Sequence, residues 1–202
     1  MKINPEDYTS HFKTADPKIH DLISNLGRMQ FPIVRDYYDA LIRAIVGQQV
    51  STKAAQAVYE KLLSRYNSIL DPGILKASTQ EELREAGISR QKHKYIVDLS
   101  THFVEKPEIF EKLEKLDDDR VIESLTSIKG IGVWTAQMFL MFTLRRMDVF
   151  PADDLGIRTA MAKLYNFDRD ATPKKLYVEL SQPWAPYRSV ASWYLWESLR
   201  EK

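Results

Sequence analysis

LTSIKGIGVWTAQMFLMF, residues 125–142, is the most informative segment of this chain for predicting its fold. It sets Ile128-Lys129-Gly130-Ile131-Gly132 between a polar-capped helix expected over Asp119 to Leu125 and a segment from Val133 that is apolar almost all round. Two glycines one residue apart permit backbone conformations that are closed to other residues, and they allow a second backbone to approach closely. The pattern predicts a tight turn between two helices, of which the second is buried.

The same turn is a candidate anion site. Successive backbone amides at the N-terminus of the following helix point outward together and can bind an anion. DNA phosphate is the anion that such amides would hold without selecting a base sequence. A plain helix–helix turn explains the two glycines equally well, so the glycines alone do not decide between these interpretations.

Helical periodicity extends from this turn to most of the chain. Between Asp36 and Val46 the apolar residues recur on one helical face, and Gly47 is expected to end that helix. Ser51 is placed to cap the next helix, and Thr79 followed by Glu82 has the spacing of a capping box. Further helices are expected to begin at Ser89, Pro107 and the Asp117–Asp119 run, and to cover 133–144, 154–165, 172–181 and 187–200, the third of these with Thr172 as cap and Pro173 at its first position.

Strand signals are weak throughout. The best candidate, Asp148–Phe150, is very short, and no convincing alternation of apolar and polar residues occurs elsewhere. The sequence therefore predicts an all-α fold of about ten helices.

The composition excludes several classes of site. The chain has 202 residues and no cysteine, which rules out disulfides, thiolate zinc sites and cysteine-ligated iron–sulfur clusters.

No apolar run approaches the roughly 18 residues that a membrane-spanning helix requires, and the N-terminus has no apolar signal-peptide core. We expect an intracellular protein with no membrane partner, in the cytoplasm and nucleoid of a bacterium or archaeon or in the nucleus of a eukaryote. The net charge of +1 neither favours nor opposes a nucleic-acid partner.

An acidic pair follows the turn by about twenty residues, in DVFPADDLGIRTA at 148–160. Taken alone, Pro151-Ala152-Asp153-Asp154 is a good helix start, and an acidic N-cap is commoner than a catalytic acid. The order of features is more informative than the pair, because a turn with two glycines, a buried helix and an acidic helix start follow one another.

This order resembles the helix-hairpin-helix (HhH-GPD) DNA glycosylase superfamily, and within it most nearly the 3-methyladenine DNA glycosylase II family of alkylation repair. The resemblance covers most of the chain, from about Asp36 to Trp196. Beside the hairpin and the segment DVFPADDLGIR, it is carried by RAIVGQQVSTKAA at 43–55, GISRQKHKYIVDL at 87–99 and WAPYRSVASWYLW at 184–196.

The resemblance implies a catalytic role for Asp154, because the family's aspartate is followed three residues later by an aliphatic residue, here Ile157. Asp153 is then a cap or a neighbour. A desolvated carboxylate stabilises the positive charge that develops on the sugar, and it can orient or deprotonate the attacking water.

Relatives with lyase activity carry a nucleophilic lysine where this chain has Trp134, so the resemblance implies base removal alone. Lys129 lies before the glycines, where proximity to phosphate is the better interpretation.

The resemblance also implies an aromatic base pocket. Electron-rich rings attract a cationic, alkylated base. Trp134 corresponds to a pocket wall and Trp196 to a base-stacking tryptophan, although Trp196 could also be core, as we expect for Trp193. Met138 replaces a tyrosine of similar proteins, which leaves the range of damaged bases open.

Contacts to DNA follow from the same resemblance. Gln48 and Gln49 match the segment that fills the gap left by a flipped base, and which of the two intercalates is left open, as is the alternative that both are ordinary loop residues. A monovalent cation, Na⁺ or K⁺, is expected at the hairpin through the main-chain carbonyls of Thr126, Ile128 and Ile131; no cofactor is required for the reaction. The remaining candidate DNA contacts are Lys129, Gly130, Ile131, Gly132, Thr135, Ser89 and Lys92, with Arg90 and Lys94 as weaker ones.

We therefore expect two helical lobes, 36–146 with the hairpin and 1–35 plus 147–202 with Asp154, and a cleft between them at which both lie. The expected function is excision of alkylated purines (3-methyladenine, 7-methylguanine, with hypoxanthine and ethenoadenine as further candidates) by base flipping and N-glycosidic hydrolysis, which initiates base excision repair. The partner is duplex DNA with a damaged base, and the protein is expected to be a monomer. Three alternatives are a glycosylase for oxidised or mismatched bases, a non-catalytic helix-hairpin-helix DNA-binding protein, and a helical protein-interaction domain.

Overall fold

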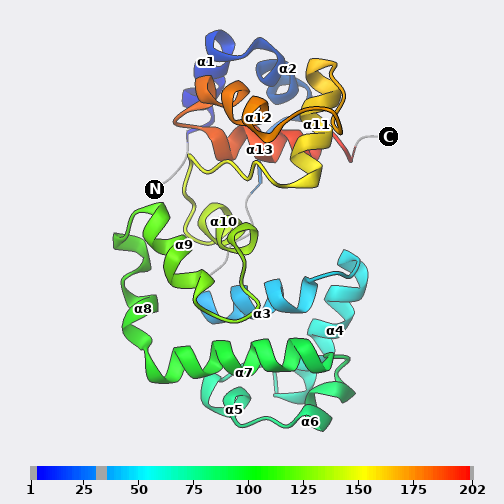
Figure 1. Cartoon of the computed structure of the whole chain (residues 1–202), viewed down its shortest axis with the longest axis vertical. Helices are drawn as coiled ribbons and strands as arrows, with labels where there is room; N and C mark the ends of the chain where they lie inside the picture. Colours follow the sequence, from blue (N-terminus) through cyan, green and yellow to red (C-terminus); the bar gives the residue numbers. More distant parts are fainter. Residues whose placement is uncertain (1–3, 31–35, 201–202) are drawn as a thin grey trace. The chain divides into compact units, whose positions relative to one another are not determined.

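The computed structural model describes residues 4–30 and 36–200, and within these ranges it contains thirteen α-helices, two 3₁₀-helices and no strand (Figure 1). The all-α prediction is confirmed. The chain divides into two compact units, Met1–Pro32 with Arg145–Lys202 and Ile33–Leu144. The lobe boundaries expected from the sequence lie after residues 35 and 146, and residue 35 is outside the described residues.

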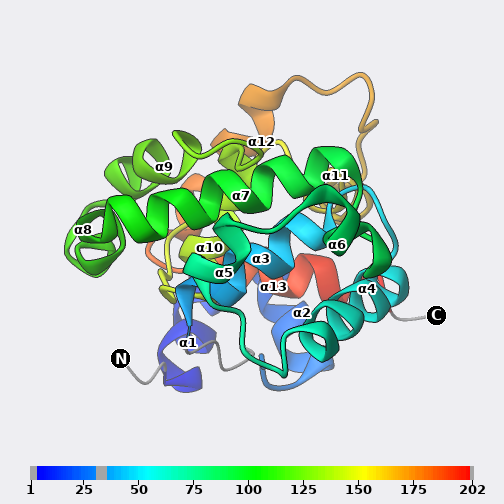
Figure 2. The same ribbon diagram turned by 90° about the horizontal axis from the view of Figure 1, so that it is seen from below.

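The unit Ile33–Leu144, called the hairpin unit below, is built around α7 (Arg90–Glu105). Figures 1 and 2 show α7 as its long helix, in contact with α3 on one side and with α5 and α6 on another. The other elements of this unit are α3 (Tyr37–Gly47), α4 (Thr52–Arg65), α5 (Pro72–Lys76), α6 (Gln80–Glu85), α8 (Pro107–Glu111), η1 (Leu113–Lys115), α9 (Asp118–Thr126) and α10 (Val133–Phe142).

Local capping explains where these helices start. The Ser51 hydroxyl accepts a bond from the Ala54 amide, and Thr79 and Glu82 form the predicted capping box. Ser89 caps α7 and Asp117 caps α9 in the same way. α3 ends at Gly47. The helix starts and the end predicted from these residues are confirmed.

The second unit, called the aspartate unit below, combines both ends of the chain. It contains α1 (Pro5–Ala15), α2 (Pro17–Leu26), α11 (Leu155–Tyr165), α12 (Lys174–Leu180), η2 (Gln182–Trp184) and α13 (Arg188–Glu197). α13 packs against both α2 and α11 (Figure 1), and the core includes the fully buried side chains of Phe12, Tyr177, Trp184 and Tyr194.

The sequence analysis assigns no helix before residue 36, although a signal for two is present. Asn4 and Asp16 each precede a proline, and each side chain caps the helix that follows. Proline is favoured at the first helical position. These two helices and the short α5 raise the number above the predicted ten or so, whereas α8 begins at Pro107 as predicted.

The weak strand signal at 148–150 has no counterpart in the structure, and one local prediction, the start of α12, is wrong. Residues 148–150 form no strand; the Val149 amide instead donates to the Ser189 hydroxyl at 3.0 Å, because the segment crosses the start of α13 rather than another strand. α12 begins at Lys174, with Pro173 in the cap position. The Thr172 hydroxyl does not cap it, because it donates to the Asp168 carbonyl at 2.5 Å and closes the preceding loop.

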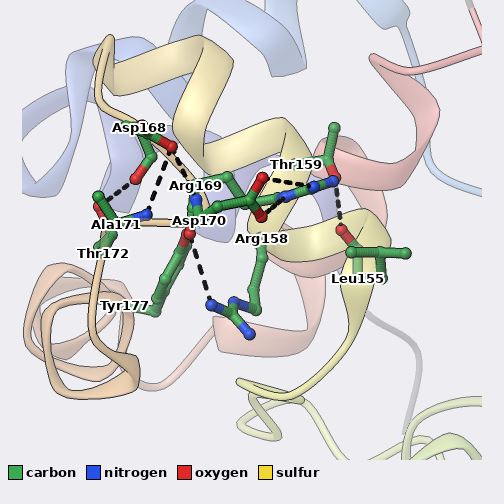
Figure 3. A network of polar contacts seen from close by, with 9 residues as sticks. All are labelled: Leu155, Arg158, Thr159, Asp168, Arg169, Asp170, Ala171, Thr172 and Tyr177. Atoms are coloured by element: carbon green, nitrogen blue, oxygen red, sulfur yellow. Dashed lines mark hydrogen bonds and ion pairs between the residues drawn. The ribbon is translucent and has the colours of Figure 1, made fainter.

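Figure 3 shows how this loop is held against α11. The Asp168 carboxylate accepts the amides of Asp170 and Ala171, and the Arg169 carbonyl accepts the Tyr177 hydroxyl at 3.2 Å. Arg158 of α11 reaches the same carbonyl. These bonds pair polar groups of the loop with partners inside the aspartate unit.

None of the helices in residues 4–30 and 36–200 combines the length and the apolar character needed to span a bilayer.

Candidate active site

The hairpin, residues 127–132, connects α9 to α10 as predicted from the two glycines. The buried side chains of Ile128 and Ile131 anchor it, and the Ile131 amide donates to the Ile128 carbonyl at 3.1 Å. Gly132 occupies the cap position of α10 without a side-chain cap. The first amides of a helix lack intrahelical partners and favour an anion. Val133 and Trp134, in this first turn, are 52% and 48% exposed, so the turn is accessible.

Gly130 is required for two independent reasons. Its φ of +85° lies in the left-handed region that favours glycine. A Cβ at this position would also lie only 2.3 Å from ring carbons of Tyr95 on α7. The hairpin therefore rests directly on an aromatic ring, a contact that the sequence analysis missed.

Asp98 of α7 is a second residue that the sequence analysis missed. Its Oδ2 accepts the Lys129 amide at 2.9 Å, and its Oδ1 lies 3.3 Å from the Lys129 Nζ. The Asp98 side chain is 17% exposed and the Lys129 side chain 75% exposed. The mostly buried Asp98 carboxylate therefore fixes the hairpin backbone at Lys129. No local pattern links residues 98 and 129, which are 31 positions apart.

The loop after α3 is tied to the same hairpin. The Gln48 side-chain amide donates to the Gly130 carbonyl at 2.7 Å. Gln49, by contrast, is exposed and has a φ of +58°. The Lys92 ammonium donates to the Val46 carbonyl at 2.7 Å, and burial lowers its pKa. The two glutamines, equivalent in the sequence, therefore have different environments.

A pocket of about 640 Å³ lies between α3, this loop and α10. Its volume is in the range of pockets that bind small molecules. Leu41, Phe139 and Phe142 supply apolar surface. Five residues singled out from the sequence line it together: Gln48, Gln49, Trp134, Thr135 and Met138.

Arg43 adds a positive charge to the lining, a feature missed from the sequence. Its Nε donates to Asp39 at 2.8 Å, and its guanidinium carbon lies 3.7 Å from the centre of the Tyr59 ring. Burial, followed by the hydrogen bond to Asp39, raises the pKa of Tyr59 to about 12. Tyr59 is therefore neutral at physiological pH and presents its ring face to the cation.

Asp154 is the N-cap of α11 in the aspartate unit. Its Oδ1 accepts the Ile157 amide at 2.8 Å and the Trp196 indole N–H at 2.8 Å. The residue is partly buried, and Ile157 is fully buried. Asp153 is exposed, and its carboxylate lies 2.5 Å from the Lys174 Nζ. Only Asp154 of the acidic pair combines partial burial with two N–H donors from separate helices.

The remaining candidates fall into the same two units. Trp196 and Trp193 lie on α13, where both pack beside the core of the aspartate unit. Ser89 uses its hydroxyl to cap α7, and Arg90 and Lys94 are exposed on that helix. The assignments of these residues to DNA contacts remain predictions.

Two of the three hairpin carbonyls proposed to bind a monovalent cation have lone pairs available for it. Thr126 is the last residue of α9, so its carbonyl has no intrahelical partner. The Ile128 carbonyl accepts one amide and keeps a second lone pair. Neutral oxygens of this kind suit Na⁺ or K⁺. Among the residues that the structure describes, no group of three or more His, Asp or Glu side chains is placed to bind a metal.

Comparison with known proteins identifies the family to which this chain belongs. Residues 42–186 match the HhH-GPD superfamily base excision DNA repair protein family. The chain is 36% identical over 168 residues to DNA-3-methyladenine glycosylase 1 of Schizosaccharomyces pombe. This alignment covers 81% of this chain and 73% of that relative. It is 32% identical over 228 residues to DNA-3-methyladenine glycosylase of Saccharomyces cerevisiae, with coverages of 92% and 77%.

Solved structures give the same result. DNA-3-methyladenine glycosidase from Bacillus halodurans matches with a TM-score of 0.80 and 36% identity, over 94% of this chain and 89% of that one. The 3-methyladenine DNA glycosylase of S. pombe in complex with abasic DNA matches with a TM-score of 0.85 and 30% identity, over 96% and 97% of the two chains.

Proposed function

Since the chain belongs to the HhH-GPD superfamily of base excision DNA repair proteins, we propose that it starts repair by excising alkylated purines from duplex DNA. Its class is that of the DNA glycosylases, which hydrolyse N-glycosyl bonds, and its relatives are named for 3-methyladenine. The proposed substrates are 3-methyladenine and 7-methylguanine, with hypoxanthine and ethenoadenine as further candidates. The single observation that carries the proposal is the orientation of the Asp154 carboxylate by two N–H donors.

Asp154 supplies the chemistry in this proposal. As the bond between the base and C1′ breaks, positive charge develops on the sugar, and a carboxylate held nearby stabilises it. The same group orients or deprotonates the water that adds to C1′. An alkylated purine loses its positive charge as it leaves, so little acid catalysis is needed.

Base removal without strand cleavage is supported by the side chains around the hairpin. A lyase needs a nucleophilic amine to form a Schiff base, and Trp134 has none. The nearest candidate in sequence, Lys129, has its ammonium 3.3 Å from the Asp98 carboxylate.

The aromatic pocket supports base flipping. Trp134 and Met138 line it, beside Phe139 and Phe142, and aromatic faces stabilise a cationic base by about 1–3 kcal/mol. Trp196 is proposed to stack on the flipped base as well. Because Gln48 already bonds to the hairpin, we assign the gap-filling role to Gln49.

The hairpin is proposed to hold one DNA strand through the amides at the start of α10, with Na⁺ or K⁺ bound to the carbonyls of Thr126, Ile128 and Ile131. A bound cation would stabilise the turn and attract phosphate. The proposal requires the hairpin and Asp154 to face the same stretch of DNA in the complex. The protein is expected to act as a monomer.

The test compares wild type with Asp154→Asn on alkylated DNA and on defined duplexes with hypoxanthine or ethenoadenine, with released base as the measurement. Asparagine preserves the helix cap, so the fold is expected to persist while excision falls at least about 100-fold. Asp153→Asn, next to it in the sequence, is the matched control and is expected to keep its activity, because Asp153 is an exposed partner of Lys174.

Three outcomes contradict the proposal or part of it. A wild type that releases none of these bases contradicts it entirely and favours a non-catalytic DNA-binding protein. Release of oxidised or mismatched bases alone contradicts the proposed substrates. An Asp154→Asn variant with nearly full activity contradicts the mechanism.

A further inference from the structure

Trp196 bonds directly to the carboxylate on which the proposed chemistry depends. Its indole N–H, from α13, donates to the Asp154 Oδ1 at 2.8 Å, across 42 residues of sequence. The same oxygen accepts the Ile157 amide at 2.8 Å. Two donors from different helices that meet at one oxygen restrict rotation of the carboxylate more than a helix cap alone does.

Gly156 makes this contact possible. A Cβ on residue 156 would lie 2.9 Å from the Trp196 Cδ1, 3.1 Å from its Nε1 and 3.0 Å from the Asp154 Oδ1. Real Cβ atoms are not found so close to a ring carbon, so the indole or the carboxylate would have to move. The absence of a side chain at this position in the first turn of α11 therefore admits the indole N–H to the carboxylate.

Rigid packing places the indole there. α13 packs against both α11 and α2, and Leu195, beside Trp196, is fully buried in the core of the aspartate unit. Trp196 itself packs on this core and is partly buried. The donor is thus fixed by the packing of the unit, whereas a residue on a loop would leave the carboxylate less constrained.

We propose that Trp196 is a positioning residue for Asp154, with Gly156 as the spacer that allows the indole N–H to reach the carboxylate. This inference rests on the proposed function and adds to it, because stacking on a base needs only the indole ring whereas positioning needs its N–H. The two roles of Trp196 can therefore be separated by substitution.

The experiment measures base excision in single turnovers over a range of enzyme concentrations, which yields a maximal rate constant and a half-saturating concentration. Trp196→Phe keeps an aromatic ring and removes the donor. We expect its maximal rate constant to fall roughly 10- to 100-fold, because misplacement of a reacting group has effects of this size. Its half-saturating concentration, and its affinity for duplex DNA that contains a stable abasic analogue, are expected to change less than about 3-fold, because the ring that stacks is retained.

Two further variants sharpen the test. Gly156→Ala keeps every polar group and favours the helix, so the same loss of rate in this variant comes from displacement of the indole or of the carboxylate that it contacts. It also keeps the proposal testable if Trp196→Phe does not fold. Trp193→Phe, the same substitution one turn earlier on α13, is the matched control and is expected to keep the wild-type rate.

A structural readout accompanies the kinetics. The chain has four tryptophans, so the indole N–H signal that disappears from a ¹⁵N–¹H spectrum of Trp196→Phe identifies residue 196. That signal is expected to shift in Gly156→Ala and in Asp154→Asn but not in Asp153→Asn.

Several results would overturn the inference. A Trp196→Phe variant within about 3-fold of the wild-type maximal rate shows that the N–H is dispensable. A rise in the half-saturating concentration with an unchanged maximal rate assigns Trp196 to stacking alone. An unshifted indole signal with full activity in Gly156→Ala contradicts the spacer. Wild type without excision contradicts the proposed function and this inference together, whereas active wild type with active Trp196→Phe contradicts only the latter.

Discussion

The side-chain amide of Gln48 donates a 2.7 Å hydrogen bond to the backbone carbonyl of Gly130, 82 residues away. The loop after α3 and the hairpin therefore form one connected surface of the hairpin unit, and the pocket lined by Trp134 and Met138 includes Gln48 in its wall.

Removing this bond should weaken the hairpin unit. Gln48→Met keeps the length of the side chain and removes the donor, and the free energy of unfolding is expected to fall by about 1 kcal/mol. Urea denaturation is the measurement. Gln56→Met is the control: its amide bonds to Glu60 on an exposed helix face at 2.8 Å, so a change of about 0.5 kcal/mol or less is expected. Equal losses in the two variants would show that the Gln48 contact does not stabilise the fold.

The two hairpin glycines should respond differently to alanine. At Gly130 the positive φ and the Tyr95 ring 2.3 Å from a Cβ both oppose a side chain, so Gly130→Ala is expected to lose roughly 2 kcal/mol or more. At Gly132 a Cβ meets nothing within 4 Å and φ is −94°. Gly132→Ala is therefore expected to keep its stability within about 1 kcal/mol.

The same pair separates folding from DNA binding. If phosphate approaches the start of α10, the methyl group of Gly132→Ala lowers affinity for duplex DNA in fluorescence anisotropy while the fold persists. Unchanged affinity in a folded Gly132→Ala variant argues against the proposed phosphate site.

Asp148 should make stability depend on pH in the acid range. Hydrogen bonds from Arg188, at 2.7 and 2.8 Å, hold the pKa of Asp148 below its ordinary value. A carboxyl whose pKa is lowered by folding stabilises the folded state above its unfolded pKa, and this stability is lost as pH falls through the folded value.

Asp148→Asn is therefore expected to lower the free energy of unfolding at pH 7 by about 1 kcal/mol, a figure reduced from that of a buried charged bond because about a third of both side chains is exposed. The difference from wild type should shrink as pH falls below about 4. Urea denaturation at pH 7 and at pH 3 tests this, and a difference that does not change with pH contradicts the ion pair as its source.

Asp16 should be a major source of stability in the aspartate unit. One carboxylate oxygen caps α2, and the other accepts the indole N–H of the fully buried Trp184 at 2.8 Å and the hydroxyl of Tyr165. Asp16→Ala removes a cap and leaves a buried donor unpaired, so a loss of roughly 2–4 kcal/mol is expected.

Asn4→Ala is the matched control for Asp16, because Asn4 caps α1 through one exposed bond and has no buried partner. Its expected loss is about 1 kcal/mol. Thermal or urea unfolding of both variants measures the difference, and equal losses would contradict the role of Trp184 and Tyr165.

Local sequence was sufficient for most helix starts in this chain. Ser51, Thr79, Ser89 and Asp117 each bond to an amide three residues ahead, so the pattern and its partner lie in one short segment. Thr172 shows the limit of this rule. Its hydroxyl could have capped α12, but it donates to the Asp168 carbonyl in the preceding loop instead.

The sequence also pointed to Asp154, Trp134 and Met138 through their resemblance to a family, and to the hairpin through its glycines. It did not indicate Asp98, Tyr95 or Arg43, and it could not distinguish Gln48 from Gln49 or assign the Trp196 N–H to Asp154. Each of these roles depends on a contact between segments that are distant in the sequence, and no local pattern indicates which distant segments meet.

Local patterns in the sequence therefore gave the class of fold and most helix starts after residue 36, because those depend on bonds across three or four residues. Motifs taken in order singled out Asp154 as the candidate carboxylate. Tertiary structure alone decided which side chains hold the hairpin and the carboxylate in place. Those contacts span 31, 42 and 82 residues. They exist only once apolar burial has brought the helices within hydrogen-bonding distance of one another.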